Sequence, residues 1–274
     1  MRSIPAFVFT LAILLFTTPA FAVTLDLQGE SVQGGLVFGK TDAGARVQLD
    51  GKDIRVAPTG DFLVGFARDA KGTHTLTAVG GDDSRETRLL TIGLRQFDIQ
   101  HIDGLPERQV TPNAEDLVRI RSEAAEMKQA RAHYGADALF RSGFDWPAEG
   151  PISGVYGSQR ILNGEPRAPH YGLDIAGPAG TPVRAAAAGT VLFAHPGMYF
   201  NGRTLVIDHG LGLQSIYLHL SEISVAPGTR VEKGQIVGKI GATGRVTGPH
   251  LHWGLQWNNV YVDPILVLPA RNKP

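Results

Sequence analysis

The chain has 274 residues, with 26 basic and 26 acidic side chains, 43% hydrophobic residues and no cysteine. A balanced charge gives no support for binding to nucleic acid or to an anionic surface, and the length favours two domains over one. The lack of cysteine excludes disulfides, thiolate nucleophiles and thiolate metal ligands, so any metal must be held by His, Asp or Glu.

Residues 1–22 have the pattern of an export signal. Arg2 precedes an apolar run that is shorter than the ~20 residues of a membrane-spanning helix, and Ala20-Phe21-Ala22 has the small-x-small form of a cleavage site. An uncleaved anchor is the alternative, whereas a lipid anchor is not expected because no cysteine follows the run. We therefore expect cleavage after Ala22, an exported and periplasmic protein, and no stable membrane insertion after cleavage.

Residues 23–103 alternate in short polar and apolar bursts that predict a small β-sandwich. In ARVQLDGKDIRV, Val47 and Leu49 alternate with polar neighbours, Asp50-Gly51 marks a turn, and Ile54 resumes the alternation, which predicts a hairpin. The segment has no cluster of acids and a single isolated histidine before its last strand. We interpret it as a packing or spacing module, with a wall- or partner-binding module as the alternative.

Residues 104–145 are predicted to be a linker with one connector helix. Asn113 can cap this helix, and Asp116 lies in its first turn. The predicted packing face repeats at helical spacing and is only partly apolar, comprising Leu117, Ile120, Ala124, Met127, Arg131 and Tyr134. We expect the helix to lie on one of the domains.

Residues 146–268 return to short strands separated by Gly and Pro, as in RTLVIDHG, QSIYLHL and HLHWGLQW. The alanine run in TPVRAAAAGTV is flanked by Thr-Pro and Gly-Thr, so we expect strand there and not helix. The segment lacks both a phosphate-binding glycine loop and an HExxH motif, which excludes a zincin-type helix. The predicted fold is thus mainly β throughout.

Two pairs of polar residues in this β segment have the spacing of metal ligands. His250 and His252 are two residues apart and share one face of a strand, with Leu251 turned into the core, and His170 and Asp174 share a face if no bulge intervenes. Isolated histidines on strands are usually structural, whereas two such pairs in one domain make a metal site an equal alternative, and spacing alone does not decide between them. Imidazoles with one carboxylate suit zinc, and three protein ligands leave a position for water.

The same stretch resembles a known family. The segments HYGLD, AGTPVRAAAAGTV, IDHGLGLQSIYLHLS and VEKGQIVGKIGATGRVTGPHLHWG, in this order, are similar to the M23 metallopeptidases, the lysostaphin- or LytM-like peptidoglycan endopeptidases. The resemblance implies an antiparallel β-sheet groove with a single zinc on its floor. It also implies that His170, Asp174 and His252 bind the zinc and that His219 and His250 are the catalytic pair.

The function implied is hydrolysis of the peptide cross-links between the peptide stems of peptidoglycan. In a Gram-negative wall the bond would join D-alanine to the side-chain amine of diaminopimelate; the polyglycine bridge cut by the lysostaphin branch is the less expected substrate, and the sequence itself shows no bond preference. The alternative is a catalytically silent LytM-like binder that activates wall amidases, which some relatives of this fold are. All five implied positions are filled here, which favours the enzyme.

The remaining histidines and one loop receive simpler interpretations. His209 is expected to end a strand as a structural residue, and His195 is placed in a loop that could line the groove. The turn-rich stretch LNGEPRAP could shape substrate access, and its Asn163 or Glu165 could occupy the open metal position in a latent form.

Overall fold

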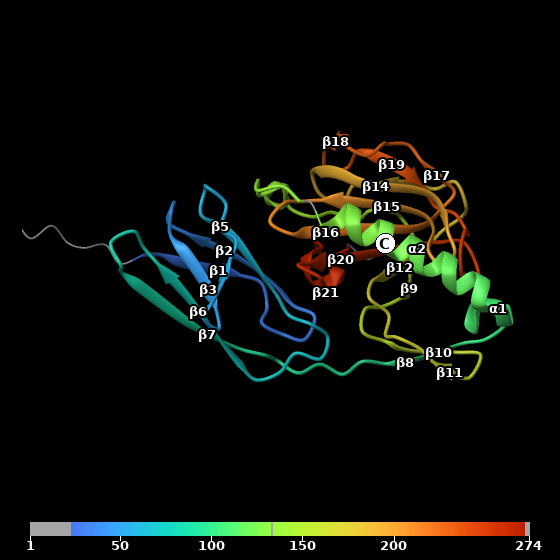
Figure 1. The fold of residues 1–274 in the computed structure, drawn as a ribbon, viewed down its shortest axis with the longest axis horizontal. Helices are drawn as coiled ribbons and strands as arrows, with labels where there is room; N and C mark the ends of the chain where they lie inside the picture. Colours follow the sequence, from blue (N-terminus) through green and yellow to red (C-terminus); the bar gives the residue numbers. More distant parts are fainter. Residues whose placement is uncertain (1–22, 133, 272–274) are drawn as a thin grey trace, which may run out of the picture.

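A computed structural model describes residues 23–132 and 134–271, so the predicted export signal lies outside the described residues. The molecule is mostly β, with an N-terminal sandwich at one end and a larger sheet domain at the other (Figure 1). Within the described residues, no helix is both long enough and apolar enough to cross a membrane.

The N-terminal part is a sandwich of two antiparallel sheets. One sheet has the order β1 (Leu25–Gln28), β2 (Leu36–Thr41), β5 (Asp61–Gly65), and the other β4 (Lys52–Ile54), β3 (Arg46–Leu49), β6 (Thr73–Val79), β7 (Arg85–Thr91). Their inner faces bury Val47, Phe62 and Leu76. The predicted hairpin is confirmed: β3 pairs with β4, and Asp50 and Gly51 take the positive φ values of 51° and 75° that a two-residue turn requires.

The segment after the sandwich runs along the second domain. Strand β8 (Ile99–Ile102) pairs in parallel with β10 (Gln159–Leu162), which also pairs with β11 (Glu165–Pro166). The domain boundaries at residues 103 and 145 stay predictions. They assign β8 to the sandwich, but the backbone of β8 pairs with β10 of the other domain. Two helices follow, α1 (Glu107–Val110) and α2 (Ala114–Arg131), then the single-turn helix η1 (Leu139–Ser142).

Helix α2 begins as predicted, and its packing face overlaps the predicted one only in part. The Asn113 side chain accepts a hydrogen bond from the Asp116 main-chain N–H, as expected of a cap. The expected face is right only in part: Met127 packs on the sheet and Arg131 bonds Gln214, but Leu117 is 38% exposed. The buried residues of the helix, Asp116 and Glu123, were not expected; both carboxylates are held by hydrogen bonds, so polar contacts add to the apolar ones in docking the helix.

The C-terminal part is built on one large antiparallel sheet. Its order is β18 (Arg230–Val231), β14 (Gly189–Met198), β15 (Gly202–Asp208), β16 (Leu213–Leu220), β20 (His250–Trp257), β12 (Leu173–Ala176), β9 (Ile152–Gly154), with β21 (Val260–Val262) paired to β20. A separate small sheet has the order β13 (Pro182–Arg184), β19 (Ile236–Lys239), β17 (Glu222–Ile223). The last element of the chain is the single-turn helix η2 (Pro264–Val267).

The large sheet has two different faces. One face packs into the main core through Tyr217, Trp253 and Ile175, all fully buried. The other face carries Ile216 and Leu218, which contact Met127 of α2. Figure 1 shows α2 lying across this second face. The helix therefore covers part of the face from which a groove would open.

Two local expectations are settled in this domain. The alanine run is not helical, as expected, but strand is confirmed only beside it: Pro182–Arg184 is strand, whereas residues 185–188 are buried outside any strand. His195 is not in a loop, because it lies within β14 and pairs with Thr204 of β15. A loop was expected because Pro196 follows His195. A proline is tolerated in a strand where the register shifts, and β14 has such a shift between His195 and Met198.

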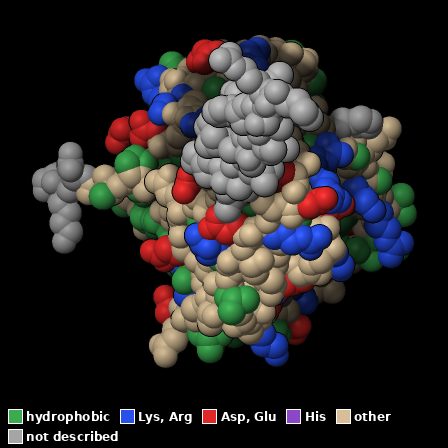
Figure 2. Space-filling model, turned by 90° about the vertical axis from the view of Figure 1, so that its left-hand side faces the viewer, with side chains coloured by type: hydrophobic (Ala, Val, Ile, Leu, Met, Phe, Trp, Pro, Cys, Tyr) green, Lys and Arg blue, Asp and Glu red, His purple; other side chains and the backbone are tan. Residues whose placement is uncertain are grey.

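The sandwich and the sheet domain share apolar packing. Leu36 and Leu63 of the sandwich belong to the same buried cluster as Trp257 and Val262, and Arg95 forms an ion pair of 2.7 Å with the buried Asp263 carboxylate. Figure 2, a view of the N-terminal end, shows side chains of both charge signs spread over that face.

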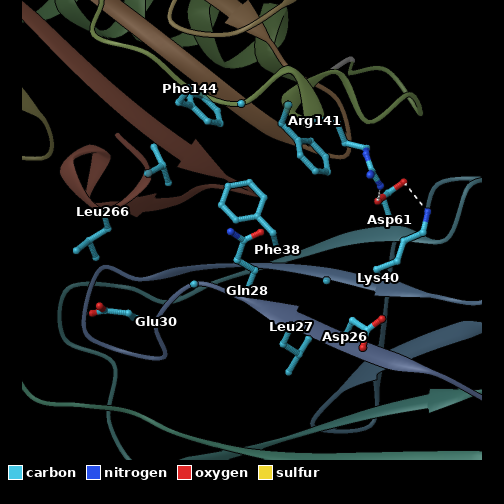
Figure 3. Close-up of a pocket in the computed structure, with 15 residues that line it drawn as sticks. Asp26, Leu27, Gln28, Glu30, Phe38, Lys40, Asp61, Arg141, Phe144 and Leu266 are labelled. Carbon is cyan, nitrogen blue, oxygen red and sulfur yellow. Dashed lines mark hydrogen bonds and ion pairs between the residues drawn. The ribbon is translucent and has the colours of Figure 1, made fainter. Parts of the chain in front are cut away.

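A cleft of about 760 Å³ lies between the outer face of β1–β2 and segments of the sheet domain (Figure 3). Phe38 contacts Phe140 at a ring distance of 5.8 Å, and Asp61 pairs with both Lys40 and Arg141. None of the histidines singled out from the sequence lines this cleft, so its contacts join the two parts of the molecule and do not belong to the candidate site.

Candidate metal centre

The sheet register brings the predicted residues together. Asp174 of β12 pairs directly with His252 of β20, and residues paired across antiparallel strands point to the same face. His170 lies in the loop before β12, where its main-chain N–H donates to Ser158 at 2.8 Å. The three side chains, which we call the donor triad, therefore meet on the second face of the sheet.

The donor atoms of the triad converge on one point. His170 Nε2 lies 3.0 Å from Asp174 Oδ1 and 2.9 Å from His252 Nδ1, and His252 Nδ1 lies 2.8 Å from the same Asp174 oxygen. Two imidazole nitrogens and one carboxylate oxygen at such distances form the group of described residues best placed to hold a cation. Two neutral imidazoles and a carboxylate form a donor set that zinc accepts, with one position left open.

Neighbouring groups fix the orientation of the triad. His170 Nδ1 faces the Val155 carbonyl at 3.0 Å; since a carbonyl only accepts, Nδ1 carries the proton in the neutral ring and Nε2 keeps its lone pair. Gly172 leaves room for the second imidazole, because a Cβ there would lie 2.6 Å from the ring of His252. The surroundings thus fit a bound metal.

One residue of the site was missed by the sequence analysis. Arg160 Nη2 in β10 donates to Asp174 Oδ2 at 2.7 Å, which leaves Oδ1 free to face the two imidazoles. Nothing in its spacing points to this contact, because Arg160 lies on a different strand from the carboxylate it holds.

Burial and hydrogen bonds set the charge states of Asp174 and His252. Burial by itself would raise the pKa of Asp174, but hydrogen bonds and charge from His170 and His252 hold it well below its usual value. Burial also lowers the pKa of His252 to about 4. The carboxylate is therefore ionised and this imidazole neutral at neutral pH, the protonation states that metal binding requires.

His219 reaches the same face through an irregular strand. Leu205 pairs with Tyr217 and Arg203 with Leu220, so β16 has one residue more than β15 over this interval, which is a bulge. His219 stands in the bulge with a φ of 64°, and its ring Nδ1 donates to the Thr243 carbonyl at 2.8 Å. Burial, followed by the charges of His252 and His250, lowers its pKa to about 3.

His250 completes the group. Its Nδ1 faces the Gly248 carbonyl at 2.9 Å, and its Nε2 lies 3.9 Å from Asp174 Oδ1. The rings of His219 and His250, which we call the histidine pair, are 4.9 Å apart between centroids, and that of His219 is 6.2 Å from His252. All five predicted site residues therefore lie in one cluster.

The other predicted residues lie elsewhere. His209 is buried, with Nδ1 donating to Ala188 at 2.8 Å and Nε2 accepting from Ser215 at 2.7 Å, as expected of a structural histidine. Asn163 does not occupy the open metal position, because its amide bonds both main-chain groups of Leu105. Glu165 is exposed and lies 3.9 Å from Arg167.

Known proteins match the segment of the chain that contains this cluster. Residues 168–264 match the model of peptidase family M23. The DD-carboxypeptidase/endopeptidase Mpg of Neisseria meningitidis is 44% identical over 99 residues, 36% of this chain and 22% of the relative. The peptidoglycan DD-endopeptidase ShyA of Vibrio cholerae is 49% identical over 90 residues, 32% of this chain and 20% of the relative. The matched part thus spans about a fifth of each relative.

A solved structure matches much more of the chain. It is a Pseudomonas aeruginosa protein assigned to peptidase M23, 32% identical, with a TM-score of 0.65, and the match covers 87% of this chain and 95% of that one. Because this likeness covers most of both chains, and because residues 168–264 match the family model, the chain is a member of peptidase family M23.

Proposed function

We propose that the protein is a zinc-dependent endopeptidase that hydrolyses peptide cross-links of peptidoglycan. The observation that carries the proposal is the convergence of three donor atoms within 3.0 Å of one another, with a second pair of imidazoles directly beside them. A zinc ion held by His170, Asp174 and His252 would act as a Lewis acid and make water nucleophilic near neutral pH.

The histidine pair is suited to move protons. The Gly248 and Thr243 carbonyls each take the Nδ1–H of one ring, so in the neutral form each Nε2 presents a lone pair. Hydrolysis removes a proton from water and delivers one to the leaving amine, and His250 and His219 are the described imidazoles beside the triad that can do both. Charge on the tetrahedral oxygen would be stabilised in the same place.

The substrate class rests on the relatives and on the predicted export signal. ShyA and ShyB of Vibrio cholerae are named peptidoglycan DD-endopeptidases. An exported protein with this site would meet the cell wall, so we assign it to the periplasm and to the bond between D-alanine and the side-chain amine of diaminopimelate. The silent amidase activator is the weaker alternative, because every donor position and both histidines of the pair are present.

Metal content and wall digestion test the proposal together. The purified protein is freed of metal with a chelator, checked by elemental analysis, and assayed on purified sacculi before and after addition of zinc. We expect one zinc per chain, cleavage only with zinc, and fragments that correspond to opened cross-links. Full activity in the metal-free protein would overturn the metallopeptidase assignment, and zinc binding without cleavage would favour the silent binder.

A further inference from the structure

Two arginines beside the metal centre donate to one short stretch of the linker. Arg245 Nη1 lies 3.2 Å from the Gln109 carbonyl, and Arg167 Nη2 lies 3.1 Å from the Val110 carbonyl. Because the two acceptors belong to consecutive residues of α1, both guanidinium groups face the same end of this helix. They therefore form a pair of cations side by side.

This arginine pair adjoins the candidate site on two sides. Arg167 precedes His170 by three residues in the same loop. Arg245 follows Thr243, whose carbonyl holds the ring of His219, by two residues, and its own main-chain N–H donates to Phe200. The loops that position one donor of the triad and one histidine of the pair thus also carry the two cations.

The charges of the pair are poorly neutralised. In residues 23–132 and 134–271, Arg245 has no carboxylate at ion-pair distance; it stacks on Phe200 at 4.2 Å and bonds a neutral carbonyl. Arg167 has only the exposed Glu165 at 3.9 Å, and its Nε is buried without a hydrogen-bond partner. Burial, followed by the nearby charges of Arg160 and Arg167, lowers the pKa of Arg245. Both side chains are half-buried, and partly desolvated cations without a close counter-ion favour an anionic ligand here.

We propose that Arg167 and Arg245 form a subsite for a carboxylate group of the substrate. The inference rests on the proposed function and deepens it. In a cross-link to diaminopimelate, the carbon that bears the scissile nitrogen also bears a carboxylate, so this group must lie close to the metal centre when the bond is cleaved. Paired guanidinium groups bind carboxylates through charge-assisted hydrogen bonds, which are about twice as strong as bonds between neutral groups.

The linker occupies this subsite in the present structure. The carbonyl oxygens of Gln109 and Val110 take the donors that a carboxylate would use. A carbonyl is neutral, whereas a carboxylate compensates the charge of both arginines, so the substrate group is the better acceptor. Binding of the substrate therefore requires α1 to release the two guanidinium groups.

The test compares three cross-linked peptides that differ only at the carboxylate next to the scissile amide. One contains diaminopimelate with the free acid, one the corresponding amide, and one lysine, which lacks the group. With the zinc-loaded full chain, we expect kcat/KM for the free acid to exceed that for the other two by about 10- to 100-fold. Equal values for the three peptides would overturn the inference while leaving the proposed function intact.

Variants assign the preference to the arginines. Arg245→Gln and Arg167→Gln should each lose activity mainly on the free acid, so that the ratio between peptides falls towards one, while Arg245→Lys should keep part of it. Arg88→Gln, at a half-exposed position of the sandwich, is the matched control and should leave the ratio unchanged. An equal loss on all three peptides would show that the arginines only hold the loops.

A binding measurement keeps the two proposals separate. If the zinc-loaded chain cleaves none of the peptides, the proposed function fails, and calorimetry with uncleaved free-acid and amide peptides still tests the subsite. Tighter binding of the free acid that is lost in Arg245→Gln supports the subsite, and equal binding of both peptides refutes it.

Discussion

His250 and His252 stand on the same face of β20 but have different surroundings. His252 Nδ1 lies within 3.0 Å of both other donors of the triad, whereas His250 approaches Asp174 only to 3.9 Å. We expect His252→Ala to lose zinc and activity together. We expect His250→Ala to keep zinc and lose about 10²-fold or more in turnover, because it removes proton transfer and not a donor.

Zinc content and turnover measured on the same preparations check this division, with folding followed by circular dichroism. His219→Ala should behave as His250→Ala does, and the double variant should lose less than the sum of the two effects if the pair acts as a unit. Folded His250→Ala without zinc, together with zinc-loaded His252→Ala, would reverse the two assignments.

The sequence could place part of this site and not the rest. The even spacing of His250 and His252 fixes a common face in any regular strand, so their side-by-side position follows from the sequence alone. Alternation along β16 would put His219 on the core face with Tyr217, and only the bulge brings it to the other face. The prediction that His219 belongs to the site therefore came from the family resemblance. The contact from Arg160 to Asp174 could not be predicted from the spacing of the residues.

His209 should make the stability of the protein depend on pH. Burial lowers its pKa in the folded protein from 6.5 to about 4. Between these values the unfolded chain binds the proton more readily, so the stabilisation is complete above pH 6.5 and is lost as the pH falls towards 4. One pKa unit corresponds to about 1.4 kcal/mol, so the loss is on the order of 3 kcal/mol.

Urea unfolding at several values between pH 4.5 and pH 7 measures this effect. His209→Asn removes the titrating ring, so it should lower the free energy of unfolding at pH 7 and flatten its decrease with acidification relative to the wild type. An identical pH dependence in the two proteins would show that His209 is not the group responsible.

At the scale of elements, helix α2 shows why apolar periodicity predicted only part of the packing face. Its docking depends on carboxylates: Glu123 accepts from the Tyr199 main-chain N–H at 2.7 Å and from Arg119 at 2.7 Å, and Asp116 pairs with Arg108. In a sequence a carboxylate is taken for a solvent-facing residue, and Tyr199, which binds both of these carboxylates, lies 76 residues from Glu123 and 83 from Asp116. The start of the helix was predictable because the Asn113 cap is local.

These contacts predict which glutamate of α2 matters. Glu123→Ala leaves the Tyr199 N–H without its acceptor, so we expect the free energy of unfolding to fall by about 1–3 kcal/mol and the amides of α2 to exchange faster. Glu126→Ala, at an exposed position of the same helix, is the matched control. Equal effects of the two substitutions, measured by urea unfolding and hydrogen exchange, would contradict the polar docking of α2.

At the scale of the whole molecule, two β segments separated by a predicted linker share their packing. The alternation of polar and apolar residues predicted a sandwich and a sheet domain, and the strands of both are present. What the sequence could not provide is the contact between them, because Leu63 and Trp257 lie on elements far apart in the chain. Strand β8, which follows the sandwich, adds backbone hydrogen bonds to β10 of the sheet domain.

The shared packing predicts that the two parts unfold together. Leu63 is 1% exposed in β5 and belongs to the buried cluster that contains Trp257 and Val262. We expect Leu63→Ala to lower the free energy of unfolding by about 2–5 kcal/mol and to shift one transition that includes the sheet domain. Leu89→Ala, 69% exposed on the sandwich, should leave that transition in place. Calorimetry, together with Trp fluorescence from the sheet domain, measures both variants. Two separate transitions, with the fluorescence transition unmoved by Leu63→Ala, would show that the sandwich and the sheet domain fold independently.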